Sequence, residues 1–144
     1  MHEALVVKRI GSVTLGLHAH RRYLERAGVP RNLDSLQKHS VIGFDRETPA
    51  IRSMRRRVPG FELIRFAFGT DSDVAQLMAI KAGLGIGICQ VPLAPKDSNL
   101  RRVLAGMLEL RLGVWAVMHE NLRSTPRCRV VFDGLVAGLK AHID

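Results

Sequence analysis

The sequence has few cysteines, few aromatic residues and no long apolar run, and each shortage excludes a class of protein. Two cysteines are too few to hold a small domain together through disulfides. No stretch approaches the roughly 20 apolar residues of a membrane-spanning helix, and the N-terminus lacks the apolar stretch of a signal peptide. Aromatic residues make up only 5% of the chain, which is poor for a surface that stacks on bases. These shortages predict a cytoplasmic protein that does not enter a membrane.

The residues that are present describe an ordinary globular chain with a basic charge balance. Hydrophobic residues make up 47% and charged residues 24% of the 144 residues, whereas a disordered chain has too little apolar content to build a core. A chain of this length suits a single domain that buries about two thirds of its unfolded surface. The formal net charge of +9 raises the question of an acidic partner.

Strand and helix patterns alternate along the chain. Strands are predicted near residues 12–18, 41–44, 61–68, 86–89, 101–104 and 112–118. Helices are predicted near residues 20–27, 32–39, 73–83 and 126–139. Residues 45–60 contain two prolines and a glycine and are predicted to form a loop or an edge hairpin. This order predicts an α/β fold with a mixed or mostly parallel sheet, in which ligands bind where the carboxyl ends of strands meet helix N-termini.

The sequence contains no catalytic motif. There is no Gly-x-Ser-x-Gly elbow, no His-Glu-x-x-His pair and no P-loop, so the sequence argues against an enzyme and implies no cofactor. The glycine-rich residues 83–87 follow a predicted helix and precede a strand, whereas a phosphate-binding loop runs from strand to helix. We therefore interpret them as a helix end with close backbone packing. Cys89 and Cys128 have no catalytic partner nearby in sequence and are interpreted as small core residues.

His18 and His20 are two residues apart and are the only candidate metal ligands. On a strand they would share one face and could chelate a metal. No neighbouring Cys, Asp or Glu completes a ligand set, so the pattern favours a strand that ends and leads into a helix. We predict no metal site.

The densest basic cluster comprises Arg52, Arg55, Arg56 and Arg57. It is a candidate contact for phosphates or for another acidic partner. The alternative is a solvated loop that aids solubility, because no recognition helix surrounds the run. The sequence leaves both open.

Thr70, Asp71 and Ser72 precede a predicted helix. Two hydroxyl groups at a helix N-terminus can form an anion site, although the Asp71 charge would repel a carboxylate. The same residues can equally serve only to cap the helix. The sequence does not decide between the two.

The order of these segments resembles the effector-binding domain of LysR-type transcriptional regulators over almost the whole chain. Residues 13–30 are similar to the family's strand and SPxYLxxxGxP helix, 32–39 to its TPxDLxxH helix, 70–87 to its NDxxAxxxAxxAGLGI segment, and 115–127 to its VYAVYP…SPR end. His20 and Arg21 stand where the family usually has Ser and Pro. That difference removes one small hydroxyl from the expected pocket.

The resemblance implies a periplasmic-binding-protein type II-like α/β fold, with lobe two complete and lobe one partial. Lobe two with its crossover strands would span approximately residues 12–117, with the crossovers near 12–17 and 112–117. Residues 118–144 would form a C-terminal helix that returns to lobe one. The resemblance also implies that the helix-turn-helix domain and the first half of lobe one lie outside this chain.

The resemblance further implies a ligand-sensing function in transcription regulation. A small effector, expected to be an organic acid, would bind between the lobes, and DNA would be contacted only through the N-terminal domain. Family effector domains pair side by side, so a homodimer is expected. The effector wall would comprise His20, Gly43, Phe44, Thr70, Asp71, Ser72, Cys89 and Gln90. The alternative function is a basic module that binds nucleic acid directly through Arg52–Arg57.

Overall fold

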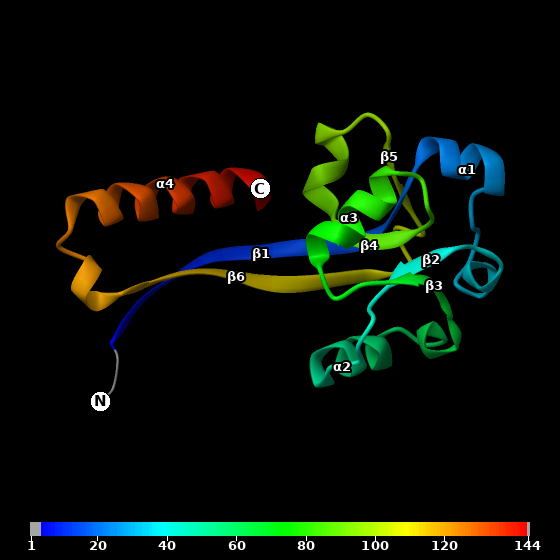
Figure 1. Cartoon of the computed structure of the whole chain (residues 1–144), viewed down its shortest axis with the longest axis horizontal. Coiled ribbons are helices and arrows are strands. Elements are labelled where there is room, and N and C mark those ends of the chain that lie inside the picture. The colour runs from blue at the N-terminus through cyan, green and yellow to red at the C-terminus, as the bar shows by residue number, and fades with distance from the viewer. Residues whose placement is uncertain (1–3, 144) are drawn as a thin grey trace. The chain divides into compact units, whose positions relative to one another are not determined.

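The computed structural model describes residues 4–143 and divides into two compact units (Figure 1). Unit 1 combines residues 4–14 with residues 111–143, and unit 2 is the continuous segment Leu15–Leu110. Two long strands, β1 (Leu5–His20) and β6 (Glu109–His119), pair with each other and supply residues to both units. The identification of these units with the two lobes stays a prediction.

Unit 2 is built on a sheet in which the second half of β1 has a neighbour on each side. The strands β4 (Gly87–Gln90) and β5 (Leu100–Val103) flank it, and both run antiparallel to it. The strands β2 (Val41–Gly43) and β3 (Phe66–Gly69) form a parallel pair. A parallel bridge and a 2.8 Å backbone hydrogen bond from Ile42 join β2 to the residue before β4. The sheet is therefore mixed, and β1 runs opposite to β2, β3 and β4.

Two helices of unit 2 begin and end where sequence signals place them. Helix α1 (Arg21–Ala27) is capped by His20 and ends at Gly28, whose φ is 88°. Helix α3 (Asp73–Lys81) starts at Ser72, and the chain after it turns through Gly83, whose φ is 77°. Glycine suits both turns because its backbone enters positive φ without strain. Short 3₁₀ turns occupy Asp34–Lys38 (η1) and Val91–Lys96 (η3).

The glycine-rich segment after α3 is a helix end with close packing, as predicted. A Cβ added to Gly85 would lie only 2.2 Å from the carbonyl oxygen of Ser40. No side chain fits at that position, so the glycine lets two backbone segments approach each other.

Three sequence predictions in unit 2 are wrong. The helix predicted over 32–39 is only a 3₁₀ turn of 5 residues, η1. Residues 45–60 contain a helix, α2 (Pro49–Arg57), rather than a loop or hairpin throughout, because the Thr48 hydroxyl accepts from the Ile51 N–H and proline suits the first turn. The predicted strand over 61–68 begins late. Phe61–Leu63 form a 3₁₀ turn (η2), since Gly60 enters it at a φ of 84°, and only then does β3 begin.

The core of unit 2 consists of two clusters of buried apolar residues. The larger includes Leu17, Leu36 and Ile86, each fully buried. The smaller packs Ile80 of α3 against Ile42 of β2 and also contains Cys89 and Leu100. Each fully buried aliphatic side chain contributes roughly 1.5–3 kcal/mol. These contacts hold α3 against the sheet.

Unit 1 joins its part of β1 and β6 to helix α4 (Pro126–Ile143), which starts at Pro126 as predicted. The Glu120 N–H of the turn η4 (Glu120–Leu122) donates to the Ala4 carbonyl at 3.0 Å, and the Arg9 guanidinium lies 5.6 Å from the Trp115 ring centre. A Cβ at Gly11 would lie 2.8 Å from Ile143, so the end of α4 packs on β1. Among the described helices, none combines the length and apolarity needed to span a bilayer.

Candidate functional site

The candidate site lies at the edge of unit 2 where β2 and β3 end. Gly43 is the last residue of β2 and Thr70 is the first residue after β3, and the Thr70 N–H donates to the Gly43 carbonyl at 3.0 Å. The Gln76 side chain lies beneath them, 4% exposed, and its Nε2 donates to the Gly43 carbonyl at 3.2 Å and to the Thr70 carbonyl at 2.9 Å. One amide therefore fixes two strand ends to α3.

Gln76 was missed by sequence reasoning. A buried amide must find partners for its polar atoms, and Gln76 stands four residues after the N-cap among apolar residues that face the core. The signal was a polar residue on the apolar side of a helix. Only the structure shows that its partners are carbonyls at two strand ends.

The hydroxyl groups of Thr70 and Ser72 lie at the start of α3. The Thr70 oxygen accepts from the Ser72 N–H, and the Ser72 oxygen accepts from the Ala75 N–H, both at 3.2 Å. A hydroxyl that accepts a hydrogen bond still carries a proton to donate. Two such donors at the positive end of a helix dipole can stabilise an anion.

Asp71 is paired with a residue that sequence reasoning did not name. Its Oδ1 accepts from the Arg46 N–H at 2.9 Å, and its Oδ2 lies 3.7 Å from the Arg46 Nε. Both side chains are largely exposed, so the ion pair adds little stability. It does offset the negative charge that the sequence led us to expect would repel a carboxylate.

Phe44, Cys89 and Gln90 belong to neighbouring strand ends but differ in exposure. Phe44 follows β2 and is half-buried, whereas Gln90 ends β4 and is exposed. Cys89 lies in the smaller core cluster, and burial raises the pKa of its thiol to about 11. A protonated, buried thiol is a packing group. The Cys89 side chain thus lies behind this edge.

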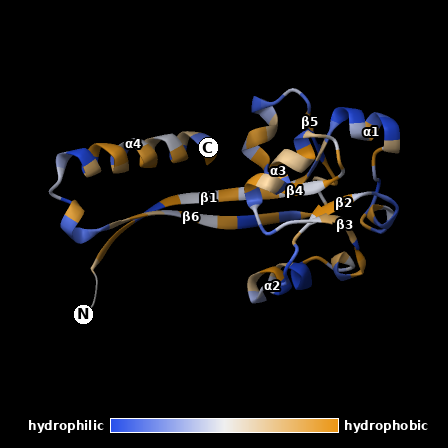
Figure 2. Cartoon of the chain, viewed as in Figure 1, coloured by the Kyte–Doolittle hydropathy of each residue, from blue (hydrophilic) through white to orange (hydrophobic). Residues whose placement is uncertain are grey.

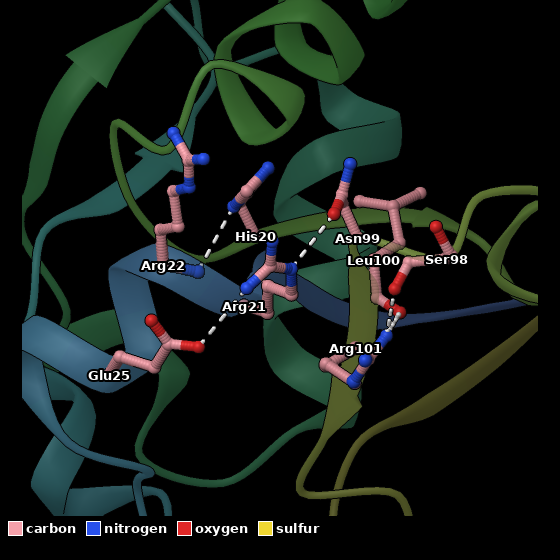
Figure 3. Close-up of polar contacts among 8 residues, drawn as sticks. All are labelled: His20, Arg21, Arg22, Glu25, Ser98, Asn99, Leu100 and Arg101. Atoms are coloured by element: carbon pink, nitrogen blue, oxygen red, sulfur yellow. Dashed lines mark hydrogen bonds and ion pairs between the residues drawn. The ribbon is translucent and has the colours of Figure 1, made fainter.

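His20 is not brought to this edge. Strand β1 runs antiparallel to β4, so the carboxyl end of β1 lies at the edge of the sheet opposite to the candidate site. There His20 pairs with Leu100 of β5. The His20 Cβ is 3.9 Å from a Cβ built on Gly83, beyond the far end of α3. Its Nδ1 accepts from the Arg22 N–H at 3.0 Å, and Figure 3 shows the ring beside α1 and the residues of β5. The structure therefore separates His20 from Thr70 and Ser72.

His18 has a different role from His20. It is fully buried, and its Nδ1 lies 2.9 Å from the Gly16 carbonyl, to which it donates. Burial lowers the pKa of His18, and the nearby Arg102 charge lowers it further against the opposing effect of the Gly16 hydrogen bond. Within residues 4–143, no three His, Cys, Asp or Glu side chains gather as a metal site requires.

The structure divides the arginine cluster. Arg52, Arg56 and Arg57 are exposed on α2. Arg55 turns inward, with its guanidinium 4.7 Å from the Phe66 ring centre. The four arginines therefore do not act as one patch.

Comparisons with known proteins agree with one another. A family model described as the LysR substrate binding domain matches residues 1–140. The fold is similar to the regulatory domain of CrgA, a LysR-type transcriptional regulator from Neisseria meningitidis, with a TM-score of 0.77 and 22% identity over 94% of this chain and 69% of that one. It is also similar to the effector domain of the transcriptional regulator AmpR of Pseudomonas aeruginosa, with a TM-score of 0.65 and 16% identity over 98% of this chain and 67% of that one.

The chain is shorter than the full-length proteins that share this fold. It covers 49% of the full-length structure of AphB, a virulence activator of Vibrio cholerae, with a TM-score of 0.62 and 18% identity over 97% of this chain. It also covers 49% of full-length CrgA. A search of the curated proteins finds no match to this sequence.

Proposed function

Because the chain belongs to the LysR substrate-binding domain family, we propose that it is the effector-sensing part of a LysR-type transcriptional regulator. The family match over residues 1–140 confirms the resemblance and the periplasmic-binding-protein type II-like α/β fold predicted from the sequence. The family consists of regulatory domains and not of enzymes. This confirms the prediction that the chain is not an enzyme. Membership of this family does not favour the alternative function, a basic module that binds nucleic acid directly through Arg52–Arg57.

The proposed effector is a small organic anion bound at the carboxyl ends of β2 and β3. The observation that carries this proposal is the pair of hydroxyl groups at the start of α3, beside the two strand ends whose carbonyls the Gln76 amide binds. Thr70 and Ser72 would donate to the anion, and the helix dipole would add its positive end. The ion pair of Asp71 with Arg46 reduces the repulsion that an anion would meet.

Sensing requires more than binding. An effector shifts a conformational equilibrium only if it binds two arrangements of the protein with different affinity. We propose that occupancy of this edge is the event that the full regulator transmits to DNA, through a helix-turn-helix domain outside this chain. That the effector lies between two lobes stays a prediction.

The test is a matched pair of substitutions at Ser72. Both Ser72→Asp and Ser72→Asn keep a side chain that caps a helix well, so α3 should remain intact in both. A thermal-shift screen of small carboxylates, sulfonates and neutral analogues identifies a ligand for the unaltered chain, and calorimetry then measures its affinity. We expect Ser72→Asp to weaken anion binding at least tenfold, and Ser72→Asn to weaken it far less. Equal affinity of both variants for the anion would show that the anion does not bind at this edge.

A further inference from the structure

A hydrogen-bonded pair outside the candidate site joins helix α1 to the start of β2. Tyr23 of α1 is 4% exposed and belongs to the larger core cluster. Its hydroxyl oxygen accepts from the Ser40 N–H at 3.0 Å and lies 2.9 Å from the Nδ1 of His39. The centroids of the Tyr23 and His39 rings are 5.8 Å apart. One phenol group therefore binds both residues that precede β2.

The direction of the Tyr23–His39 hydrogen bond follows from the protons that are present. The backbone N–H of Ser40 can only donate, and a phenol has a single proton of its own to donate. Among the hydrogen bonds of the described residues, the Nδ1 of His39 is the one acceptor that meets the Tyr23 hydroxyl. A buried hydroxyl needs an acceptor, so Tyr23 donates to His39. The imidazole is then neutral, with its proton on Nε2.

Charged side chains lie on two of the three elements around His39. Helix α1 brings Arg26, whose guanidinium lies 5.5 Å from the Tyr23 ring centre. The turn η1 carries Asp34 and Lys38, both exposed, and β2 carries no titratable residue. Partial burial lowers the pKa of His39, because burial disfavours the charged form of an imidazole. The closed arrangement therefore favours the neutral ring.

We propose that Tyr23, His39 and the Ser40 amide form an acid-sensitive latch, which holds residues 28–40 against α1 and the core. A proton added to Nδ1 turns this acceptor into a donor. The Tyr23 hydroxyl then has no acceptor for its own proton, and a buried polar group without a partner is unfavourable. Opening of the latch exposes the hydroxyl, the imidazole and the amide to water, which can bind all three.

The latch is closed near neutral pH and opens as the pH falls. In the open state the imidazole is solvated and has its ordinary pKa of about 6.5. The closed state binds a proton less readily, since its pKa is lowered. The open state therefore gains population as the pH falls below about 6.5.

The latch lies at the start of the strand whose end contributes to the candidate site. The Ser40 carbonyl accepts from the Ile86 N–H at 2.8 Å, and β2 has only three residues, of which Gly43 is the last. Opening at Ser40 should thus loosen the edge at Gly43 and weaken effector binding in acid. That consequence rests on the proposed function, whereas the latch itself does not.

The experiment measures amide hydrogen exchange of the 144-residue chain by NMR at about pH 7.5 and about pH 5.5. Protection factors are compared, because they remove the intrinsic effect of pH on exchange. His39→Asn keeps an acceptor for the Tyr23 hydroxyl and does not titrate. The matched control, His20→Asn, removes an imidazole beside the same helix and keeps a good N-cap.

We expect the protection factor of the Ser40 amide to fall at least about threefold at the lower pH in the unaltered chain and in His20→Asn. In His39→Asn it should change far less. Equal losses in the unaltered chain and in His39→Asn would overturn the proposal, and so would an unaltered chain whose Ser40 protection does not depend on pH.

A second measurement needs no variant. The nitrogen chemical shifts of the His39 ring report its tautomer and its pKa. We expect the proton on Nε2 near neutral pH and a pKa below the ordinary value; a proton on Nδ1 there would reverse the hydrogen bond and overturn the latch. Both measurements are made without an effector, so the latch can fail while the proposed function stands, and the reverse.

Discussion

At the scale of single residues, two histidines that lie two positions apart in the sequence have different structural roles. His20 caps a helix through one ring nitrogen. His18 is fully buried and donates a hydrogen bond to its own strand. Burial disfavours the charged form of an imidazole, and this makes His18 a source of pH dependence in folding rather than a ligand for metal.

We predict that this chain loses stability as the pH falls from about 7.5 towards 5.5, in part through His18. Its folded pKa is lowered, so the unfolded chain binds more protons once the pH falls below the unfolded value of about 6.5. The stabilisation is present above that value and is lost as the pH falls. His18→Asn keeps a donor near the Gly16 carbonyl and should flatten the pH dependence of the melting temperature. His119→Gln, in unit 1, is the control, and an equally flat profile there would contradict the assignment.

At the scale of elements, Gln76 connects three pieces of secondary structure through one amide. Replacing it with leucine removes the hydrogen bond to the part-buried Thr70 carbonyl and the one to the buried Gly43 carbonyl, which keeps the Thr70 N–H as a donor. Each hydrogen bond contributes about 0.5–1.5 kcal/mol, so the loss of both costs roughly 1–3 kcal/mol. We expect Gln76→Leu to lower the free energy of unfolding by about that amount and to weaken effector binding as well. Gln37→Leu changes an exposed glutamine on η1 and should do neither. Urea titration measures the first effect, and calorimetry the second.

Prediction from sequence succeeds where local signals agree and fails where distant segments decide. Thr125 and Pro126 mark the start of α4, and Ser72 marks the start of α3, because caps and first-turn residues act within one turn. Helix α2 was missed because Pro49, Pro59 and the arginines between them were interpreted as a loop, although Thr48 before Pro49 is a helix start. The resemblance assigned His20 to the effector wall, whereas the antiparallel pairing of β1 with β4, which a sequence does not show, places His20 at the other edge of the sheet.

At the scale of the whole molecule, unit 1 exposes much apolar surface within the described residues. Leu5, Val7, Trp115 and Val117 lie on its two strands, and Val130, Val131 and Leu135 lie on α4, each more than half exposed. Figure 2 shows apolar segments along β1, β6 and α4. Contiguous exposed apolar surface marks an interaction site or promotes association. This surface supports the expected homodimer, which stays a prediction.

We therefore expect this 144-residue chain to sediment as a dimer, with α4 contributing to the contact. Val131 and Leu135 are four residues apart and share one side of the helix, so Val131→Glu/Leu135→Glu places two charges in the proposed contact. Burying unpaired charges is costly, and the double variant should dissociate to monomer in analytical ultracentrifugation. Val29→Glu is the control, because Val29 is 63% exposed on unit 2. A chain that is monomeric at high concentration, or a dimer indifferent to the α4 charges, would show that unit 1 does not mediate association.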